Sequence, residues 1–478
     1  MIAAIIIGIA FFSLLAVLLV RTLLFVPKRK QIANTDSIAV DVERATASLS
    51  AMIRCKTVSN TNRFLEDGAE FDKFKKLLPT LFPGVYESCG YEEPTDRSIL
   101  LRWRGECEEH PTVLMAHYDV VSANEEDWDN PAFEGLVKNG VLWGRGAIDT
   151  KVTLNAMLFA AESLIKEGFV PKRDIYFAFG GDEEINGVGA KTIAELLSKR
   201  GIEPGVVLDE GGAVVENAFP GVRGQCALIG IAEKGVVNIE YSVRSDGGHS
   251  SAPKKNTPIE RLSTACMRIK NKPFKFRLTE PAMKMIDCLG RYSAFGYRLI
   301  FANLWFFSPL LNMIAKHRGG ELDAIFRTTT AFTKMRGSEG MNVIPPIATM
   351  VSNHRVLPGD SVEGVREGLR KTVKDKNVEI RVIEGVEPSR VSITDGDAWD
   401  RISDVISATW QGAVVSPYLM FACSDSKHYS VFSDKVYRFS PLALTKEERG
   451  MIHGNNERIS KSQICKSVEF YVRLIKES

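Results

Sequence analysis

Short apolar segments alternate with longer amphipathic segments in the first half of this chain, and this alternation constrains the fold more than any other feature. Strands are expected at residues 99–103, 112–115, 174–179 and 205–208, with helices at 153–167 and 189–199 between them. Such an order predicts an α/β fold with a doubly wound, mostly parallel sheet and helices on both faces. Sheets of this kind bind ligands beyond the carboxyl ends of their strands.

The pattern changes at residue 235, where apolar and polar residues begin to alternate as in a half-buried antiparallel strand. We therefore predict an inserted α+β domain over residues 235–357, which closes with a strand at 348–355. The catalytic domain would then comprise residues 36–234 and 358–478. An aromatic-rich stretch at 295–314 inside the insert is either core or an apolar surface, and packing is the favoured role for Phe301 to Phe307.

The N-terminus carries 19 consecutive residues without a charged side chain, from Ile2 to Val20. That length suits a single helix across a bilayer, and the features of a cleavable signal are missing. Residues 1–30 are therefore predicted to be a single-pass signal anchor that ends in a basic flank, Lys28, Arg29 and Lys30. The positive-inside rule then places the catalytic domain in the cytoplasm. A buried core helix is the alternative.

The charge balance excludes one class of partner. With 61 Lys and Arg against 59 Asp and Glu, the net charge is +2, so no basic field is available for nucleic acid. The eight cysteines show no C-x-x-C spacing, which argues against a zinc ribbon or a disulfide scaffold. They are predicted to be mostly buried free thiols.

Acidic residues and histidines recur where the expected strands end. His117 and Asp119 follow the strand at 112–115, and a carboxylate beside a ring nitrogen is the support that a metal-binding histidine needs. Asp149 closes the turn Gly-Arg-Gly-Ala-Ile-Asp before a helix. Taken singly, His117 could be a structural histidine and Asp149 a helix N-cap.

Three further motifs complete this series. Residues 180–184 read Gly-Gly-Asp-Glu-Glu, residues 208–212 read Leu-Asp-Glu-Gly-Gly, and His453 lies in Ile-His-Gly-Asn-Asn-Glu at 452–457. Adjacent carboxylates repel each other, and a bound cation makes their placement favourable. A solvated acidic rim would explain one such motif but not their recurrence with two histidines.

In this order the motifs resemble the di-zinc metallopeptidases that include aminoacylase, carboxypeptidase G, acetylornithine deacetylase, succinyl-diaminopimelate desuccinylase and the Gly-X carboxypeptidases. The resemblance covers residue 45 to the end and is greatest to the Gly-X carboxypeptidase and N-acyl-amino-acid hydrolase branch. It implies two Zn²⁺ per chain, with Co²⁺ as a substitute. The implied ligands are His117, Asp149 and Asp209 for one ion, and Asp149, Glu184 and His453 for the other. The resemblance also implies that Glu183 is the general base and that Asp119 orients His117.

The insert supplies further residues by the same resemblance. His249, in Gly-Gly-His-Ser-Ser at 247–251, resembles a lid histidine that stabilises the oxyanion, often across a dimer interface, and Asn342 resembles a second lid residue. Asn353 and Arg355 resemble a clamp for a substrate carboxylate. Ser424 and Asp425 begin a loop similar to the branch's substrate loop, although Ser424 and Lys427 stand where Thr and Arg are expected. A hairpin turn and a surface salt bridge are the alternatives for the His249 and Arg355 motifs.

These features predict a membrane-anchored, zinc-dependent amide hydrolase that releases an amino acid with a free carboxylate from a short peptide or an N-acyl amino acid. The two ions and Glu183 would activate water, and the resemblance also implies a homodimer through the insert. An alternative enzyme is a dedicated acetyl or succinyl deacylase of a small metabolite. A catalytically inactive metal- or peptide-binding membrane protein is the alternative from another class.

Overall fold

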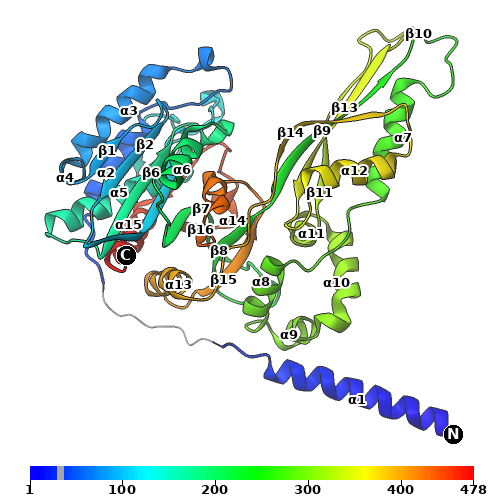
Figure 1. Cartoon of the computed structure of the whole chain (residues 1–478), viewed down its shortest axis with the longest axis horizontal. Helices are drawn as coiled ribbons and strands as arrows, with labels where there is room; N and C mark the ends of the chain where they lie inside the picture. Colours follow the sequence, from blue (N-terminus) through cyan, green and yellow to red (C-terminus); the bar gives the residue numbers. More distant parts are fainter. Residues whose placement is uncertain (29–36) are drawn as a thin grey trace.

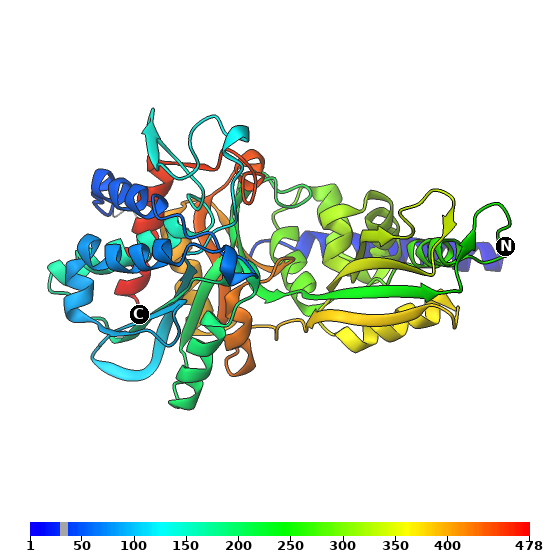
Figure 2. The same cartoon turned by 90° about the horizontal axis from the view of Figure 1, so that it is seen from above.

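The computed structural model describes residues 1–28 and 37–478. It contains a large body built on an eight-stranded sheet, an elongated unit built on a four-stranded sheet, and the long N-terminal helix α1 (Ile2–Leu24), which extends away from both (Figures 1 and 2). Arg29 and Lys30 of the predicted basic flank lie outside the described residues.

The eight-stranded sheet is mixed: its centre is parallel, as predicted, and antiparallel pairs lie beside it. Its order is β1 (Gly90–Glu92), β2 (Ser98–Trp103), β6 (Arg173–Gly180), β3 (Cys107–His117), β7 (Val206–Glu216), β16 (Val436–Ala443), β8 (Gln225–Glu233) and β15 (Val414–Met420). The central strands β6, β3, β7 and β16 are parallel to their neighbours in this group. The β1–β2, β2–β6 and β7–β8 pairs are antiparallel, whereas the edge strand β15 is parallel to β8.

Helices cover both faces of this sheet, as the alternation predicts (Figure 1). Successive residues of β3 point to opposite sides: Leu114 and Ala116 join the larger core cluster, whereas Val113 and Met115 join a smaller one. The larger cluster is covered by α2 (Val42–Ile53), α3 (Gly68–Leu81), α4 (Pro83–Ser88), α5 (Lys151–Lys166), α13 (Asp397–Thr409) and α15 (Lys461–Lys476). The smaller cluster is covered by α6 (Gly189–Lys199).

A small antiparallel sheet joins distant parts of the chain beside the large one. It pairs β17 (Arg458–Ser460) with β5 (Val141–Trp143), and β5 with β4 (Leu136–Lys138). The short helix α14 (Lys446–Arg449) precedes β17. This pairing brings the segment that contains His453 beside the Gly144–Asp149 turn.

The second unit has an antiparallel sheet of order β11 (Thr329–Arg336), β13 (Ile347–Val356), β9 (Gly235–Arg244) and β14 (Glu379–Val386). Buried and half-buried residues alternate along β9 and β13, and the buried side packs on α7 (Pro258–Asn271) and α12 (Val362–Val373). The short antiparallel pair of β10 (Gly248–His249) and β12 (Val343–Ile344) forms the free end. The sheet extends past residue 357, the predicted end of the insert, because β14 returns to pair with β9.

A helical group lies between the second unit and α1. It comprises α8 (Glu280–Gly290), α9 (Phe295–Ala302), α10 (Leu304–Arg318) and α11 (Gly320–Phe326), and it packs around its own apolar cluster. Phe301 and Leu304 are buried in this cluster, whereas Trp305 and Phe306 are exposed. Both predicted roles of the aromatic stretch, core and apolar surface, are therefore present in it.

Candidate metal centre

Five segments place acidic and imidazole side chains at one edge of the large sheet, and these segments contain His117, Asp149, Glu184, Glu210 and His453. His117 is the last residue of β3, and Glu183 and Glu184 begin the short 3-10 helix η3 (Glu183–Ile185) that follows β6. Asp149 lies two residues before α5. Because β3 and β6 are parallel neighbours, their carboxyl ends deliver these groups to the same place.

Asp149 lies between the two histidines, His117 and His453. Its Oδ1 is 3.1 Å from His117 Nε2, and its Oδ2 is 3.1 Å from His453 Nε2. His453 Nε2 is also 3.0 Å from Glu184 Oε2. One carboxylate thus offers a separate oxygen to each histidine, which is the arrangement that a carboxylate bridging two cations requires.

Asp119 forms hydrogen bonds with several residues around the metal centre. Its carboxylate accepts the backbone N–H groups of Glu183 and Glu184 at 3.2 and 3.1 Å and the hydroxyl of Ser59 at 2.7 Å. His117 Nδ1 lies 3.0 Å from the Asp119 carbonyl oxygen and 3.4 Å from its carboxylate. Asp119 therefore holds both η3 and the His117 ring, the latter more closely through its backbone than through its side chain.

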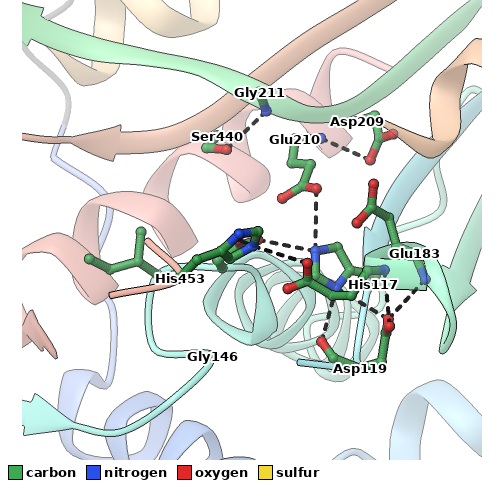
Figure 3. Close-up of polar contacts among 12 residues, drawn as sticks. His117, Asp119, Gly146, Glu183, Asp209, Glu210, Gly211, Ser440 and His453 are labelled. Carbon is green, nitrogen blue, oxygen red and sulfur yellow. Dashed lines mark hydrogen bonds and ion pairs between the residues drawn. The ribbon is translucent and has the colours of Figure 1, made fainter. Parts of the chain in front are cut away.

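The structure brings Glu210, and not Asp209, against His117. Glu210 Oε1 lies 3.3 Å from His117 Nε2 (Figure 3). Asp209 accepts the backbone N–H groups of Glu210 and Ser426, at 2.9 and 2.8 Å. Of the two acids in this motif, Glu210 is therefore the one that contacts His117.

A β-bulge explains this difference. Along the β7–β16 pair, Asp209 is opposite Arg438 but Gly212 is opposite Phe439, so Glu210 and Gly211 are extra residues in β7. Such a bulge redirects a side chain that regular alternation would place elsewhere. The Leu-Asp-Glu-Gly-Gly motif contains both acids, and no local pattern reveals the bulge.

The carboxyl groups of the centre are crowded, which shows in their acidity. Burial, together with Asp149 and Asp209, raises the pKa of Glu210 to about 8. Burial raises the pKa of Glu183 well above its usual value, and the nearby Asp425 and Glu210 add to this effect. Because like charges at this density oppose ionisation, a bound cation would stabilise the cluster.

The carboxylates of the centre stabilise the protonated forms of the two histidines. Burial opposes a charge on His117, but the carboxylates of Glu210, Asp119 and Asp149 outweigh burial and hold its pKa well above the usual value. Contacts with Asp149 and Glu184 raise the pKa of His453 to about 10. Burial opposes ionisation of Asp149, and the two histidines outweigh it and lower its pKa. Both rings thus face strong negative charge, as metal ligands would.

The loop that starts at Ser424 lies behind the centre. Ser424 donates a hydrogen bond to Glu233 Oε1 at 2.5 Å and is buried, so its hydroxyl is engaged inside the protein. Asp425 is also buried, and its pKa is raised well above the usual value by burial and by Asp209. Glu233 in turn pairs with the buried Arg438 at 2.7 Å. The Glu233–Arg438 pair therefore holds the start of the loop in place through Ser424.

Arg355 and Asn353 lie on β13, on the strand that leads toward this loop. The Arg355 guanidinium is 4.0 Å from Cys423 Sγ, directly before Ser424. Asn353 donates to Asn238 Oδ1 on the adjacent strand at 2.8 Å. Arg355 thus lies where the second unit meets the Cys423–Asp425 segment.

His249 and Asn342 lie together at the free end of the second unit, away from the metal centre (Figure 1). Gly248 and His249 pair with Ile344 and Val343, and Ser250 N–H donates to the Asn342 carbonyl. Both residues are exposed. Within one chain, the structure does not bring them to His117 or Asp149.

Two groups that support the centre had no predicted role. Glu457 is fully buried and accepts hydrogen bonds from the turn that carries Asp149, and Ser59 contacts Asp119. Glu457 stands four residues after His453, inside the motif already noted, whereas no sequence signal points to Ser59.

The residues present fit a pair of divalent cations. His117, Asp149 and Glu210 form one set, and Asp149, Glu184 and His453 form the other. The ligand atoms of His117, Asp149 and Glu184 lie within 4.8 Å of one another, as do those of His117, Glu183 and Glu210. Nitrogen and oxygen donors without thiolate are typical of catalytic zinc.

Comparison with known proteins identifies the family of this chain. Residues 113–477 match the model of peptidase family M20/M25/M40. The chain is 33% identical over 481 residues to a probable carboxypeptidase S-like 2 of Dictyostelium discoideum, covering 98% of this chain and 92% of the relative. It is 34% identical over 492 residues to the N-fatty-acyl-amino acid synthase/hydrolase PM20D1 of Xenopus tropicalis, covering 100% and 95%.

A solved structure shows the same fold. The M20 family metallo-carboxypeptidase Sso-CP2 of Sulfolobus solfataricus superimposes with a TM-score of 0.67 at 16% identity, over 90% of this chain and 98% of that one. The resemblance stated from the motifs is thereby confirmed, and so is the prediction of a hydrolase that acts on amide bonds. This chain belongs to peptidase family M20/M25/M40.

Proposed function

We propose that this chain is a two-metal amide hydrolase that releases an amino acid with a free carboxylate from an N-acyl amino acid or a short peptide. The observation that carries the proposal is the position of Asp149, whose two oxygens each lie 3.1 Å from a different histidine. The proposed ligands are His117, Asp149 and Glu210 for one ion, and Asp149, Glu184 and His453 for the other, with Glu210 in the place predicted for Asp209.

Two bound Zn²⁺ ions would polarise the scissile carbonyl and lower the pKa of water. Glu183 lies beside the ligands on η3, and its pKa is raised by burial and by Asp425 and Glu210. It is therefore suited to accept the proton of the attacking water and to donate it to the leaving amine. Asp119 holds the backbone of Glu183 in place.

Arg355 is proposed to bind the free carboxylate of the substrate, with Asn353 and the segment that starts at Ser424 and Asp425 beside it. A guanidinium offers paired donors that match a carboxylate. Its position next to Cys423 supports this role, because that segment leads directly to the loop behind the metal centre. The Ser424 hydroxyl is buried and bonded to Glu233, which favours a role in holding the loop over direct contact with substrate.

The second unit is proposed to act as a lid and dimerisation domain. His249 and Asn342 are exposed at its free end, far along the unit from the metal centre of the same chain. A second copy would be needed for His249 to stabilise an oxyanion at that centre. We also propose α1 as a single-pass membrane anchor with the catalytic domain in the cytoplasm. Its 23 residues, which include an 18-residue window with a mean hydropathy of 3.0, support the anchor.

The names of the relatives bear on the substrate. Several are N-fatty-acyl-amino acid synthase/hydrolases, and others are carboxypeptidase-like. Acylated amino acids and peptides with a free carboxylate are therefore the first substrates to test. The alternative function is a dedicated acetyl or succinyl deacylase, in which only one small acyl group is accepted.

The test combines metal content with hydrolysis by the full chain. Wild type, Glu183→Gln and the control Glu195→Gln, an exposed residue on α6, are assayed against N-acetyl, N-succinyl and long-chain N-acyl amino acids and dipeptides. We expect two Zn²⁺ per chain in all three and hydrolysis lost only in Glu183→Gln. Hydrolysis of a single short acyl group would favour the deacylase, and a protein that binds no metal would refute the proposal.

A further inference from the structure

The helices α9 and α10 present an exposed apolar surface beside α1. Six large apolar side chains are each at least 38% exposed: Phe295, Tyr297, Trp305, Phe306, Leu310 and Met313. On α10, residues 306, 310 and 313 follow helical spacing and therefore lie on one side of the helix. We name these six residues the aromatic surface.

This surface is continuous with the C-terminal part of α1. Arg21 donates to the Ala302 carbonyl at 3.2 and 3.3 Å, and Asn303 Nδ2 lies 3.1 Å from the Leu18 carbonyl and 3.2 Å from Thr22 Oγ1. Trp305 lines a groove together with Arg21 and Phe25. Figure 1 shows α1 leaving the body beside α9. The corner between α9 and α10 is thus fixed to α1.

The depth of this contact follows from the length of α1. A helix of 23 residues is about 34 Å long, against about 30 Å for a hydrocarbon layer. Leu18 and Thr22 lie within about 10 Å of its C-terminal end. If α1 crosses a bilayer, the α9–α10 corner therefore meets the edge of that layer.

The polar groups at the corner are arranged for such a position. Asn303 is fully buried, and its amide donates to two atoms of α1 and to the Leu299 carbonyl. Arg21 uses its guanidinium on the Ala302 carbonyl. Polar groups near hydrocarbon are costly unless they are satisfied within the protein. The Asn303 amide nitrogen and the Arg21 guanidinium meet that condition, whereas the buried Asn303 Oδ1 has no hydrogen-bond partner among the described residues.

The charges of the segment favour an anionic lipid surface. Residues 295–318 contain no Asp or Glu, but they contain Arg298, Lys316, His317 and Arg318. Basic residues beside exposed aromatic ones are typical of helices that lie in the interfacial region of a membrane. The bend of 110° between α9 and α10 keeps both helices short of a full span.

From these observations we infer that the aromatic surface of α9 and α10 inserts into the interfacial layer of the bilayer next to α1. The chain would then contact the membrane at two places, a spanning helix and a helical surface packed against it. This inference rests on the proposed anchor α1 and is independent of the proposed hydrolysis.

The test uses the full chain in vesicles of phosphatidylcholine and phosphatidylserine with brominated acyl chains, which quench nearby tryptophan fluorescence. The signal of Trp305 is the difference between wild type and Trp305→Phe. The matched control is Trp143→Phe, because Trp143 is half-buried in the small sheet with the Arg458 guanidinium 4.6 Å from its ring centroid. We expect quenching of the Trp305 signal to exceed that of the Trp143 signal at least twofold.

A second variant tests the surface without removing the reporter. Leu310→Glu combined with Met313→Glu places carboxylates in the surface and should at least halve the quenching of Trp305, while thermal unfolding confirms that the variant is folded. Floating vesicles that carry the chain, together with unquenched and water-accessible Trp305, would overturn the inference but leave the anchor intact. A cross-linked dimer that shields Trp305 from lipid would also overturn it. A chain that does not float would refute both the anchor and the surface.

Discussion

Glu457 Oε1 accepts the backbone N–H of Asp149 at 3.1 Å, although 308 residues separate the two in sequence. The same carboxylate accepts the N–H groups of Gly146 and Ile148 and pairs with Arg145 at 2.8 Å. Glu457 is fully buried and Arg145 nearly so. The turn that presents Asp149 between the two histidines is therefore held by one buried acid.

Replacing this acid should loosen the metal centre without touching a proposed ligand. Glu457→Gln removes the charge that pairs with buried Arg145 and places an amide N–H₂ where backbone donors now point. We expect metal affinity to fall about 10- to 100-fold, as is found when groups behind metal ligands are changed. The measurement is metal retention in competition with a chelator.

The matched control for this change is Glu447→Gln. Glu447 also pairs with an arginine, Arg458 at 2.9 Å, but its side chain is 75% exposed. Metal retention and unfolding should stay at the wild-type level. An equal loss of metal from both variants would show that the buried network does not position Asp149.

Glu210 and Asp209 can be told apart by counting bound metal. Glu210→Ala removes the oxygen 3.3 Å from His117 and should leave about one tightly held ion per chain. The backbone N–H groups of Glu210 and Ser426 bind separate oxygens of Asp209, and Asp209→Asn keeps an oxygen for only one of them, so it should lower stability but retain two ions. The opposite outcome, with two ions in Glu210→Ala and one in Asp209→Asn, would restore Asp209 as the ligand.

The buried pair of Arg438 and Glu233 should be costly to break. Arg438→Met leaves the Glu233 carboxylate buried beside Ser424 without its cation, and loss of one partner of a buried pair costs about 3–5 kcal/mol. Arg381→Met is the control, because it removes an exposed pair with Glu240 and should cost less than about 1 kcal/mol. Denaturant unfolding measures both, and equal costs would contradict this account.

His354 makes the second unit sensitive to acid. It is fully buried between the hydroxyls of Ser352 and Thr330, at 2.7 and 3.0 Å, and burial lowers its pKa from 6.5 to about 4. In the unfolded chain His354 takes up a proton near pH 6.5, whereas in the folded chain it remains neutral down to about pH 4. Stability therefore falls as the pH drops through this window, by about 2 kcal/mol between pH 6.5 and 5.

His354→Gln should remove most of this dependence. Unfolding by urea at pH 6.5 and at pH 5 measures it, and the comparison with wild type isolates the contribution of His354. The control His110→Asn changes an exposed histidine outside the second unit. An unchanged pH slope in His354→Gln would show that the ring is not held neutral.

Local sequence pattern was sufficient to predict the alternating strands and helices and the acidic motifs at the strand ends. Both features are properties of short segments. The pattern did not reveal the mixed direction of the sheet, since a strand such as β2 has the same sequence pattern in either orientation. It also did not separate Glu210 from Asp209. That choice depends on a bulge set by the partner strand β16.

The sequence by itself determined the family, the kinds of donor and the presence of an apolar N-terminal helix, because these depend on residue types and their order. Only the tertiary structure decided which acid meets His117, how Glu457 holds Asp149, and that His249 lies away from the metal centre of its own chain. It also packed α9 against α1 through Asn303. Each of these contacts joins segments far apart in sequence, so its geometry depends on how the strands and helices pack and not on any local pattern.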